Sequence, residues 1–366
     1  MLCFPSTQFA IYGVCVIKMY QMKPIIFFHP CNDCTGSTRV LSNVIAEKYN
    51  GQEVFVVTER NKNEGFLSEL HNVRIINIIN PKVNGKYIPL VSSLVWRLCA
   101  MFVTMIYGWR FKTFYINTLI PYYAALFGRL WGKTIIWHVH EKFVERPLSV
   151  RLIEYIFNTT PAHRIFVSQY VKEQYPRNSL CTEEVVYNRL SESFVKKVKM
   201  KAIEERDRNR ITMLSSLTAA KGVDMFVKLT KAMPEFHFLL VASVDKECVE
   251  MFIADNEVPD NCTVLPAQLD IHPFLRNTDL ILNLSNPSLS VETFGLTILE
   301  AMPYGIPAIV PDAGGPKELV QNGVNGYRVD VRDLESLKHY VSLALEKENY
   351  ERMAANVLSI YKETFS

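Results

Sequence analysis

The stretch NPSLSVETFGLTILEAMPYGIPAIVPDAGGPKELVQNGVNGYRV, residues 286–329, carries the alternation that decides the fold. An apolar run, LILNLS (280–285), leads into it and is typical of a buried strand. A polar loop follows, then a helical pattern over 296–305 that begins directly after Gly295, then a second apolar run, IPAIVP (306–311). Strand, helix and strand in this order predict a βαβ unit with parallel strands.

The same alternation of short apolar runs and longer amphipathic ones extends over most of the chain. Near-continuous Val, Ile and Phe runs suit parallel strands that are buried on both faces. The predicted strands are 24–29, 53–58, 73–79, 111–117, 133–139, 163–168, 184–188, 210–216, 236–242, 262–266, 280–285 and 306–311. We therefore predict an α/β fold of two Rossmann-like parallel-sheet domains that face each other across a cleft.

A charged segment, 196–210, interrupts this alternation and is predicted to be the linker between the two domains. The N-terminal domain is expected over 23–195, after an extension formed by residues 1–22, and Met19 or Met22 can be the true start. The C-terminal domain is expected over 211–350, with a final helix at 351–366 that can cross back to the N-terminal domain. A chain of 366 residues is long enough for two such domains.

The composition excludes several classes of protein. The linker segment holds seven basic and three acidic residues, and the net charge of the whole chain is +3. The rest of the chain is therefore close to neutral, so no nucleic-acid partner is expected. Eight cysteines in this length do not suggest a disulfide-stapled domain, and a reducing cytoplasm is expected. Cys31 and Cys34 form a CxxC without a second pair, which favours two ordinary loop thiols.

Two apolar segments raise the question of a membrane. Residues 9–17 are too few to span a bilayer, and 88–107 are long enough but carry Arg97 in the middle. A charge at the centre of a span costs about 2.5–3.5 kcal/mol on insertion scales. The sequence therefore favours a buried or membrane-surface helix over 88–107 rather than a membrane span.

The loop before the helix at 296 has the features of an anion and hydroxyl site. Gly295 lets the backbone approach a ligand closely, and the amides of Leu296, Thr297 and Ile298 are expected to point out of the helix N-terminus. Glu292 lies in the loop and Glu300 at least one turn into the helix. Carboxylates accept hydrogen bonds from vicinal hydroxyls, so this pair suits a sugar on one side of a diphosphate and a ribose on the other.

Other loops at predicted strand ends add to this site. Gly36 and Ser37 follow the first strand at the start of a helix, and Lys221 follows the strand 210–216 and brings a cation. Gly314 follows the strand 306–311 and leads into a short helix. Loops at the carboxyl ends of parallel strands are where ligands of doubly wound sheets bind.

These motifs resemble one known family. ETFGLTILE (292–300) strongly resembles the E-x7-E motif of glycosyltransferase family 4, and GIPAIVPDAGGPKELVQNGVNGYRV looks like its usual continuation. LSSLTAAKGVD, WHVHE and HPCNDCTGSTRVLSNVI resemble the phosphate-binding loop, histidine motif and first glycine loop of that family. The resemblance covers the chain from about Lys23 to the end. It implies a GT-B fold and retaining transfer from a nucleotide sugar to a glycan or lipid-linked acceptor, as in bacterial surface polysaccharide synthesis. Bacterial enzymes that resemble this chain often build lipid-linked glycans, which fits peripheral association of the helix at 88–107 with the cytoplasmic face of the inner membrane.

The resemblance also implies residue roles. Glu300 would bind the ribose hydroxyls, Glu292 the donor sugar, and Lys221 the phosphates. Phe294, Gly295, Leu296 and Thr297 would offer backbone groups, and His140 would help to position the sugar. Such enzymes generally need no metal or other cofactor, because cationic side chains and a helix terminus stabilise the leaving diphosphate.

One position departs from the pattern of the family. Its members usually carry an arginine five positions before the lysine, and here that position is Ser216, so half of the cationic clamp is missing. Arg39 or Arg189 could substitute. His138 and His140 are expected to face opposite sides of a strand, with only one of them in the cleft. Asn188, at a strand end, is a turn residue or a ligand contact.

Three other functions stay open. A nicotinamide-dependent oxidoreductase can also have two Rossmann-like halves, but the sequence contains no GxGxxG. A non-catalytic sugar-nucleotide-binding protein is consistent with Ser216, and a non-hydrolysing sugar-nucleotide epimerase would share the fold.

Overall fold

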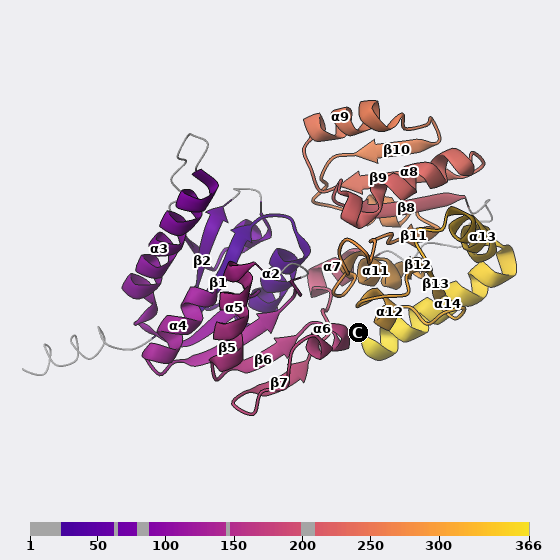
Figure 1. Ribbon diagram of the computed structural model, residues 1–366. Helices are drawn as coiled ribbons and strands as arrows, with labels where there is room; N and C mark the ends of the chain where they lie inside the picture. The colour runs from indigo at the N-terminus through magenta and orange to yellow at the C-terminus, as the bar shows by residue number, and fades with distance from the viewer. Residues whose placement is uncertain (1–22, 62–64, 79–87, 144–146, 199–208, 366) are drawn as a thin grey trace, which may run out of the picture.

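The structure, a computed structural model, describes residues 23–61, 65–78, 88–143, 147–198 and 209–365 (Figure 1). Two parallel sheets form two bodies that lie side by side, the N-terminal one in indigo to magenta and the C-terminal one in orange to yellow. The α/β architecture with two parallel-sheet domains, expected from the apolar runs, is confirmed. Residues 1–22 and most of the expected linker lie outside the described residues.

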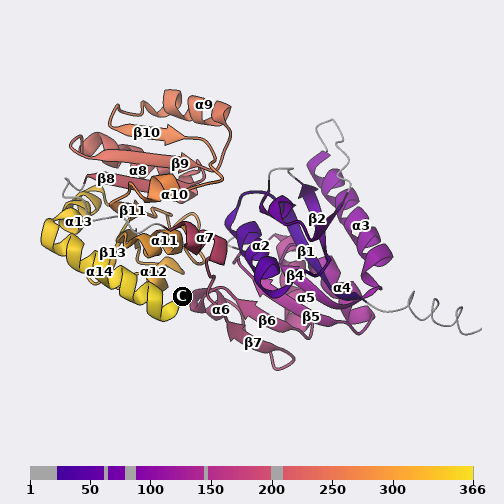
Figure 2. The ribbon, with the colours of Figure 1, turned by 180° about the vertical axis from the view of Figure 1, so that it is seen from behind.

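The N-terminal sheet has seven strands in the order β3-β2-β1-β4-β5-β6-β7, and all its pairings are parallel. Its strands are β1 Lys23–Asn32, β2 Val54–Asn61, β3 Val73–Asn77, β4 Phe111–Asn117, β5 Thr134–Val139, β6 His163–Phe166 and β7 Thr182–Val185. Its helices are α2 Gly36–Lys48, η1 Phe66–Glu69, α3 Ile88–Gly108, α4 Tyr122–Leu130, α5 Leu148–Thr159, α6 Gln169–Glu173 and α7 Glu192–Lys197. Helix α2 covers one face, and α3, α4 and α5 cover the other (Figures 1 and 2).

The C-terminal sheet has six parallel strands in the order β10-β9-β8-β11-β12-β13. Its strands are β8 Arg210–Ser215, β9 His237–Ala242, β10 Cys262–Leu265, β11 Leu280–Leu282, β12 Ala308–Pro311 and β13 Gly326–Val329. Its helical segments are η2 Ala219–Lys221, α8 Val223–Ala232, α9 Lys246–Asn256, α10 His272–Leu275, α11 Leu296–Ala301, η3 Met302–Tyr304, α12 Pro316–Leu319, α13 Leu334–Leu345 and α14 Lys347–Thr364. The order of both sheets reverses beside their first strands, which is where doubly wound sheets bind ligands.

Several elements differ in their bounds from the sequence-based prediction, and three of the differences have a clear physical cause. Strand β13 was missed because it is a short edge strand, Gly326–Val329, whose glycine and arginine give no apolar run. Strand β7 begins and ends earlier than expected, because its exposed and half-buried residues alternate at the edge of the sheet. The helix predicted over 296–305 is α-helical only to Ala301, and the 3-10 turn η3 follows, because Pro303 has no N–H to donate to an i−4 carbonyl.

Helix α3 covers the apolar segment that was predicted to be a buried or surface helix. Within the described parts of the chain, no helix combines the length and the apolar character that crossing a bilayer requires. Leu98, Phe102, Met105 and Ile106 are exposed on α3. Their spacing places them on one helix face, so α3 presents an apolar stripe to the outside.

The two bodies are joined by side-chain contacts as well as by the chain. The Ser168 hydroxyl donates to the Thr293 carbonyl at 2.6 Å, and the Glu318 carboxylate accepts from the Gln169 and Tyr170 amides at 3.0 and 2.6 Å. The end of α14 lies next to α6 (Figures 1 and 2), and the Phe365 and Tyr187 ring centroids are 6.0 Å apart. These contacts bring the carboxyl edges of the two sheets together.

Candidate active site between the two sheets

Two adjoining cavities lie where the two domains meet. The first, of about 340 Å³, is lined mainly by C-terminal residues, and the second, of about 520 Å³, mainly by N-terminal residues. Both volumes fall within the range of small-molecule sites. Thr35, Gly36, Glu292, Gly295 and Leu296 line both cavities, so no separate wall divides them.

The loop that carries Glu292 is fixed from behind by two glycines. The Gly315 amide donates to the Glu292 carbonyl at 2.9 Å. Gly314 has a φ of +71°, and a Cβ there would lie 2.2 Å from the Glu292 carbonyl oxygen. A side chain cannot fit at that distance, so Gly314 supports the loop from outside rather than lining either cavity. Gly295, with a φ of +101°, then turns the chain into α11.

Glu292 forms an ion pair with Lys221 in the first cavity. Lys221 ends η2, directly after β8, and Gly222 follows with a φ of +74°. A Cβ at Gly222 would lie 2.0 Å from the Leu284 carbonyl oxygen. This close approach to the chain after β11 brings Lys221 to the Glu292 loop.

Glu300 is buried and pairs with a cation from the other domain. Its Oε1 lies 3.4 Å from Nε of Arg39, which extends from α2. Burial raises the pKa of Glu300, and the Arg39 charge only partly offsets this effect. The Arg39 guanidinium also lies 4.1 Å from the centroid of the Phe66 ring. Arg39 is therefore held between Phe66 and Glu300 at the border of the first cavity.

Two of the three expected backbone donors remain available at the start of α11. The Ile298 amide donates to the Gly295 carbonyl at 3.0 Å, so the prediction that it is free was wrong. The cause is a tight i→i−3 turn right after the left-handed Gly295. The Leu296 and Thr297 amides bond to no residue in the described part of the chain, and both residues line the first cavity.

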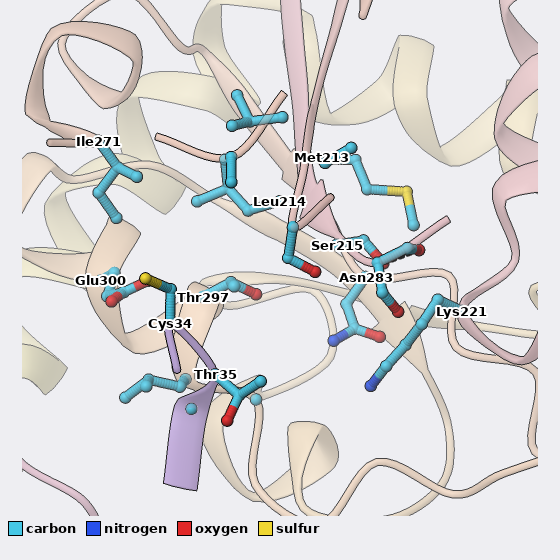
Figure 3. Close-up of a pocket in the computed structure, with 18 of the residues that line it drawn as sticks. Cys34, Thr35, Met213, Leu214, Ser215, Lys221, Ile271, Asn283, Thr297 and Glu300 are labelled. Atoms are coloured by element: carbon cyan, nitrogen blue, oxygen red, sulfur yellow. Dashed lines mark hydrogen bonds between the residues drawn. The ribbon is translucent and has the colours of Figure 1, made fainter. Parts of the chain in front are cut away.

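Figure 3 shows how the first cavity is assembled from distant segments. Glu300 and Lys221 lie at opposite sides of the view, with Thr297 and Asn283 between them. Cys34 and Thr35 reach in from the N-terminal domain at the start of α2. Ser215 and Asn283 were not predicted, although Ser215 ends β8 and Asn283 directly follows β11 at the same edge of the sheet.

A chain of hydrogen bonds lies along the second cavity. His140 Nε2 lies 2.9 Å from Asn117 Oδ1, Asn117 Nδ2 lies 3.0 Å from His29 Nδ1, and His29 Nε2 lies 3.0 Å from Thr38 Oγ1. The Thr38 hydroxyl donates to Asp33 Oδ1 at 2.7 Å. Burial alone would raise the pKa of Asp33, but hydrogen bonds from Thr35 and Thr38 outweigh it and lower the pKa.

The ionised Asp33 sets the direction of this hydrogen-bond chain, because a carboxylate only accepts. Thr38 therefore donates to Asp33 and accepts from His29, and Asn117 donates to His29 and accepts from His140 Nε2. His140 is left with Nδ1 as its acceptor nitrogen. Burial, with His138 and His29 nearby, holds the pKa of His140 well below its usual value, so the ring is neutral at pH 7.

His138 lies apart from this chain. The expectation that His138 and His140 face opposite ways was wrong, because residues two apart share one face of a strand, and the two ring centroids are 4.3 Å apart. His138 Nδ1 lies 2.9 Å from the Tyr115 hydroxyl, and burial lowers the His138 pKa to about 3. His140 lines the second cavity, whereas His138 is a buried residue behind it.

Glu141 and Asn188 bring further polar atoms to the second cavity. The Glu141 carboxylate accepts from the Leu119 amide at 2.6 Å, yet burial raises its pKa to about 7. Asn188 is only 7% exposed, and its Oδ1 has no hydrogen-bond partner among the described residues. Neither Glu141 nor Asp33 was singled out in the sequence, although Glu141 follows the histidine of WHVHE directly.

The residues expected at the site divide between the two cavities. The first is lined by Gly36, Arg39, Ser216, Lys221, Glu292, Gly295, Leu296, Thr297 and Glu300. The second is lined by Gly36, Ser37, His140, Asn188, Glu292, Phe294, Gly295 and Leu296. Arg189 is exposed beside α2, where its carbonyl accepts from Asn43 at 3.1 Å, and it lines neither cavity.

Cys31 and Cys34 form no disulfide and lie at the two cavities, Cys31 at the second and Cys34 at the first. Across the described ranges, His, Cys, Asp and Glu side chains form no group of three or more that could hold a metal ion.

Two facing parallel-sheet domains with a site between their carboxyl edges are the GT-B fold. Anabaena HepE, solved in complex with UDP and glucose, superposes with a TM-score of 0.74 over 94% of this chain and 96% of that one, at 20% identity. At this identity the similarity establishes the fold.

Sequence comparisons point to the C-terminal half. The family model described as "Glycosyl transferases group 1" matches residues 195–357. N-acetyl-alpha-D-glucosaminyl L-malate synthase of Bacillus anthracis is 30% identical over 131 residues, 36% of this chain and 33% of that protein. Sucrose synthase of Melioribacter roseus is 56% identical over 39 residues, 11% of this chain and 5% of that protein. The matched segments thus span a third or less of the length of these two relatives.

Proposed function

We propose that the protein is a retaining glycosyltransferase that moves a sugar from a nucleotide sugar to a glycan or lipid-linked acceptor. The observation that carries this proposal is the pairing of Glu292 and Glu300, each with its own cation, around a cavity between two parallel sheets. The match of the glycosyl transferases group 1 model to residues 195–357, which contain both glutamates, supports it.

In this proposal the first cavity holds the donor. Glu300 accepts hydrogen bonds from the ribose hydroxyls, and Glu292 accepts them from the hydroxyls of the sugar. The diphosphate lies between them, where Lys221 and the amides of Leu296 and Thr297 can reach it. Cations and aimed N–H groups stabilise charge that develops on a leaving diphosphate, so the reaction needs no bound metal or other cofactor in this scheme.

Arg39 supplies the second cation of the diphosphate clamp in place of the arginine that Ser216 replaces. Among the described residues that line the first cavity, two carry a Lys or Arg side chain, Arg39 and Lys221. Arg189 lies outside this cavity. Arg39 comes from the N-terminal domain, so closing the two domains completes the clamp. Binding of the ribose to Glu300 would release Arg39 to turn toward the phosphates.

The reaction that we propose forms one bond and breaks one. The oxygen of an acceptor hydroxyl bonds to the anomeric carbon of the donor sugar, and the bond from that carbon to the diphosphate oxygen breaks. The electron pair of the broken bond stays on the diphosphate, which also takes the hydroxyl proton. His140, which is neutral, positions the donor sugar through its Nδ1. Retention is inferred from the resemblance to family 4.

The donor assignment is tested first by binding. Thermal unfolding is measured with UDP, GDP, CDP and ADP and their sugars, and the matching base should stabilise the protein by about 2.7 kcal/mol at a hundredfold excess over Kd. With that donor, Lys221→Ala should raise KM or lower kcat at least about tenfold, the loss expected for a charged hydrogen bond. Lys228→Ala, at an exposed position on α8, is the control. If Lys221→Ala leaves both constants unchanged, the phosphate role is wrong.

The same assay separates the competing functions. Release of nucleoside diphosphate that depends on an acceptor supports a transferase. Conversion of the donor sugar with no acceptor present would instead identify an epimerase, and donor binding without any turnover over a broad acceptor panel would identify a non-catalytic binding protein.

We also propose that the protein works at the cytoplasmic face of the inner membrane. The α3 stripe of Leu98, Phe102, Met105 and Ile106 lies on the side of the N-terminal domain away from the C-terminal one (Figures 1 and 2). Arg110, whose guanidinium lies 5.4 Å from the Trp109 ring, and Lys133, which donates to the Trp109 carbonyl at 3.0 Å, put cations at its end. An apolar stripe with a cationic rim fits an anionic bilayer surface.

Flotation with vesicles of phosphatidylglycerol and phosphatidylethanolamine tests the membrane proposal. Wild type should float with these vesicles at low salt, and Phe102→Ser should reduce the bound fraction several-fold. Met251→Ser, at an equally exposed apolar residue on α9 in the other domain, should leave it unchanged. A protein that stays wholly unbound at low salt would refute the association.

A further inference from the structure

The second cavity is acidic. Asp33, Glu141 and Glu292 line it, and no Lys or Arg side chain occurs among its described lining residues. Glu292, which lines both cavities, is paired with Lys221 of the first cavity. A ligand in the second cavity therefore meets the Asp33 and Glu141 carboxylates, with no Lys or Arg among the described lining residues beside them.

The histidines of this cavity do not supply a charge either. His29 and His140 are neutral at pH 7, since burial lowers the pKa of His29 to about 4 and that of His140 well below its usual value. Asp33 stays ionised, because the Thr35 and Thr38 hydroxyls stabilise its charge. Glu141 is mostly ionised at pH 8, one pH unit above its raised pKa of about 7.

The polar atoms on offer are mainly acceptors. Asn188 Oδ1 is buried, lies in a residue of the cavity wall and has no partner among the described residues. The Asp33 and Glu141 oxygens can only accept when ionised, and each carboxylate already accepts hydrogen bonds from the protein. A buried acceptor without a partner is costly, so Asn188 Oδ1 needs a ligand that donates an O–H group, and the remaining lone pairs of the two carboxylates can accept further hydroxyls.

We propose that the second cavity binds the acceptor, and that the part of the acceptor that enters it is a polyhydroxylated sugar ring without phosphate or carboxylate. This inference rests on the proposed transferase function and specifies its acceptor. Sugar hydroxyls donate to Asp33, Glu141 and Asn188, whereas an anionic group would face the Asp33 and Glu141 charges with no Lys or Arg among the described lining residues. The ring lies next to Gly36 and Glu292, which both cavities share, and so beside the donor sugar.

Saturation-transfer NMR at pH 8, with the protein saturated by the nucleoside diphosphate that stabilises it most, tests the choice of acceptor. The probes are matched pairs: methyl glucoside against methyl glucuronide, and glucose against glucose 6-phosphate. We expect binding of the neutral member of each pair, at least tenfold tighter than that of the anionic one. Asn188→Leu should remove the neutral signal.

A charge-introducing variant adds a second readout. Ile120 lines the cavity and is 38% exposed, so Ile120→Lys should fold and place a cation at its border. Ile120→Lys should improve binding of the anionic probes at least tenfold, while Ile120→Met should leave their binding unchanged. Leu126→Lys, at a residue of equal exposure on α4 outside the cavity, controls for net charge.

The outcomes separate this inference from the proposed function. The inference is overturned if wild type binds an anionic probe as tightly as the matched neutral probe. It is also overturned if no neutral probe gives a signal that depends on Asn188. Stabilisation by a nucleoside diphosphate would leave the donor site standing in either case. Absence of that stabilisation would instead refute the donor site itself.

Discussion

Arg39 is the residue whose role depends most on the fold. It belongs to the first helix of the N-terminal domain, yet its charge meets Glu300 of the C-terminal domain at 3.4 Å. The ion pair gives the buried Glu300 carboxylate a positive partner. A buried carboxylate without such a partner would cost several kcal/mol of stability. In the proposed function, the same guanidinium would turn to the diphosphate once the ribose hydroxyls occupy Glu300.

Replacing Arg39 and Arg189 in parallel distinguishes the two substitutes for the missing arginine. Arg39→Met should raise the donor KM about tenfold or more, because a charge-assisted hydrogen bond contributes about 1.5–3 kcal/mol. Arg189→Met should leave KM within about twofold, since Arg189 is exposed and outside both cavities. Steady-state kinetics with the donor identified by thermal unfolding checks both, and the reverse pattern would move the clamp to Arg189.

Glu141 makes the stability of the protein depend on pH. Its folded pKa of about 7 lies above the usual 4.5, because burial disfavours the ionised form. The folded state therefore holds this proton longer than the unfolded state, and stability falls as the pH rises from about 4.5 to about 7. Between pH 5 and pH 8 the loss is about 2 kcal/mol.

Urea denaturation of wild type and Glu141→Gln at pH 5 and pH 8 measures this effect. The variant cannot ionise at this position, so its stability relative to wild type should improve by about 2 kcal/mol from pH 5 to pH 8. Glu335→Gln, at an exposed residue on α13, should show no such change. An equal difference at both pH values would show that Glu141 titrates normally.

At the scale of elements, the Glu292 loop depends on the turn that precedes α12. Gly314→Ala places a Cβ 2.2 Å from the Glu292 carbonyl oxygen, at a φ of +71°. The loop must move, so we expect donor binding to weaken and stability to fall by about 1–3 kcal/mol. Gly323→Ala carries the same backbone penalty, with a φ of +76°, but its Cβ would meet nothing within 4 Å.

Comparing these two alanine variants separates steric displacement from backbone strain. Both should lose similar stability from the left-handed backbone, and only Gly314→Ala should also lose stabilisation by the nucleoside diphosphate. Thermal unfolding with and without the nucleotide gives both quantities. Equal nucleotide responses would mean that the Glu292 loop tolerates the displacement.

The elements that the sequence predicts well are those buried on both faces. Strand β4 was predicted with its observed bounds, and its apolar run is almost wholly buried. Strand β7 was predicted with shifted bounds because half of its residues are exposed, and β13 was missed because a glycine and an arginine interrupt its four residues. Short strands of this kind at the edge of a sheet give only a weak apolar pattern.

At the scale of the whole molecule, Glu318 helps to hold the two domains together. Its carboxylate accepts from the first two amides of α6 in the other domain, at 3.0 and 2.6 Å. Glu318→Ala leaves both donors without a partner and removes a favourable anion from a helix start. We expect the domains to separate more often in the empty protein.

Small-angle scattering measures that separation as a larger radius of gyration in Glu318→Ala than in wild type. Saturating nucleoside diphosphate should bring the two values closer, because a donor held by Glu300 and Arg39 also bridges the domains. Glu335→Ala provides the control for removal of a surface charge. Identical scattering of Glu318→Ala and wild type would show that the remaining contacts suffice.

The site was predictable to the extent that it is local in sequence. The spacing of Glu292 and Glu300 and the loop of Gly295 indicated one wall of the first cavity, and both glutamates line it. The side-chain pairs of the site were not predictable, because the two members of each pair come from distant segments. Asn117 and His29 are 88 residues apart in the sequence, and Lys221 and Glu292 are 71 residues apart. Only the assembled sheets show that the second cavity is acidic.

If the two cavities hold donor and acceptor as proposed, the residues that line both of them limit how the protein can be redirected to new acceptors. Thr35, Gly36, Glu292, Gly295 and Leu296 touch both compartments, so a library built on them will change donor and acceptor use together and most members will be inactive. Ile120 and Phe143 line only the second compartment. Saturation mutagenesis should start there, where acceptor preference can drift while the donor half of the reaction is preserved.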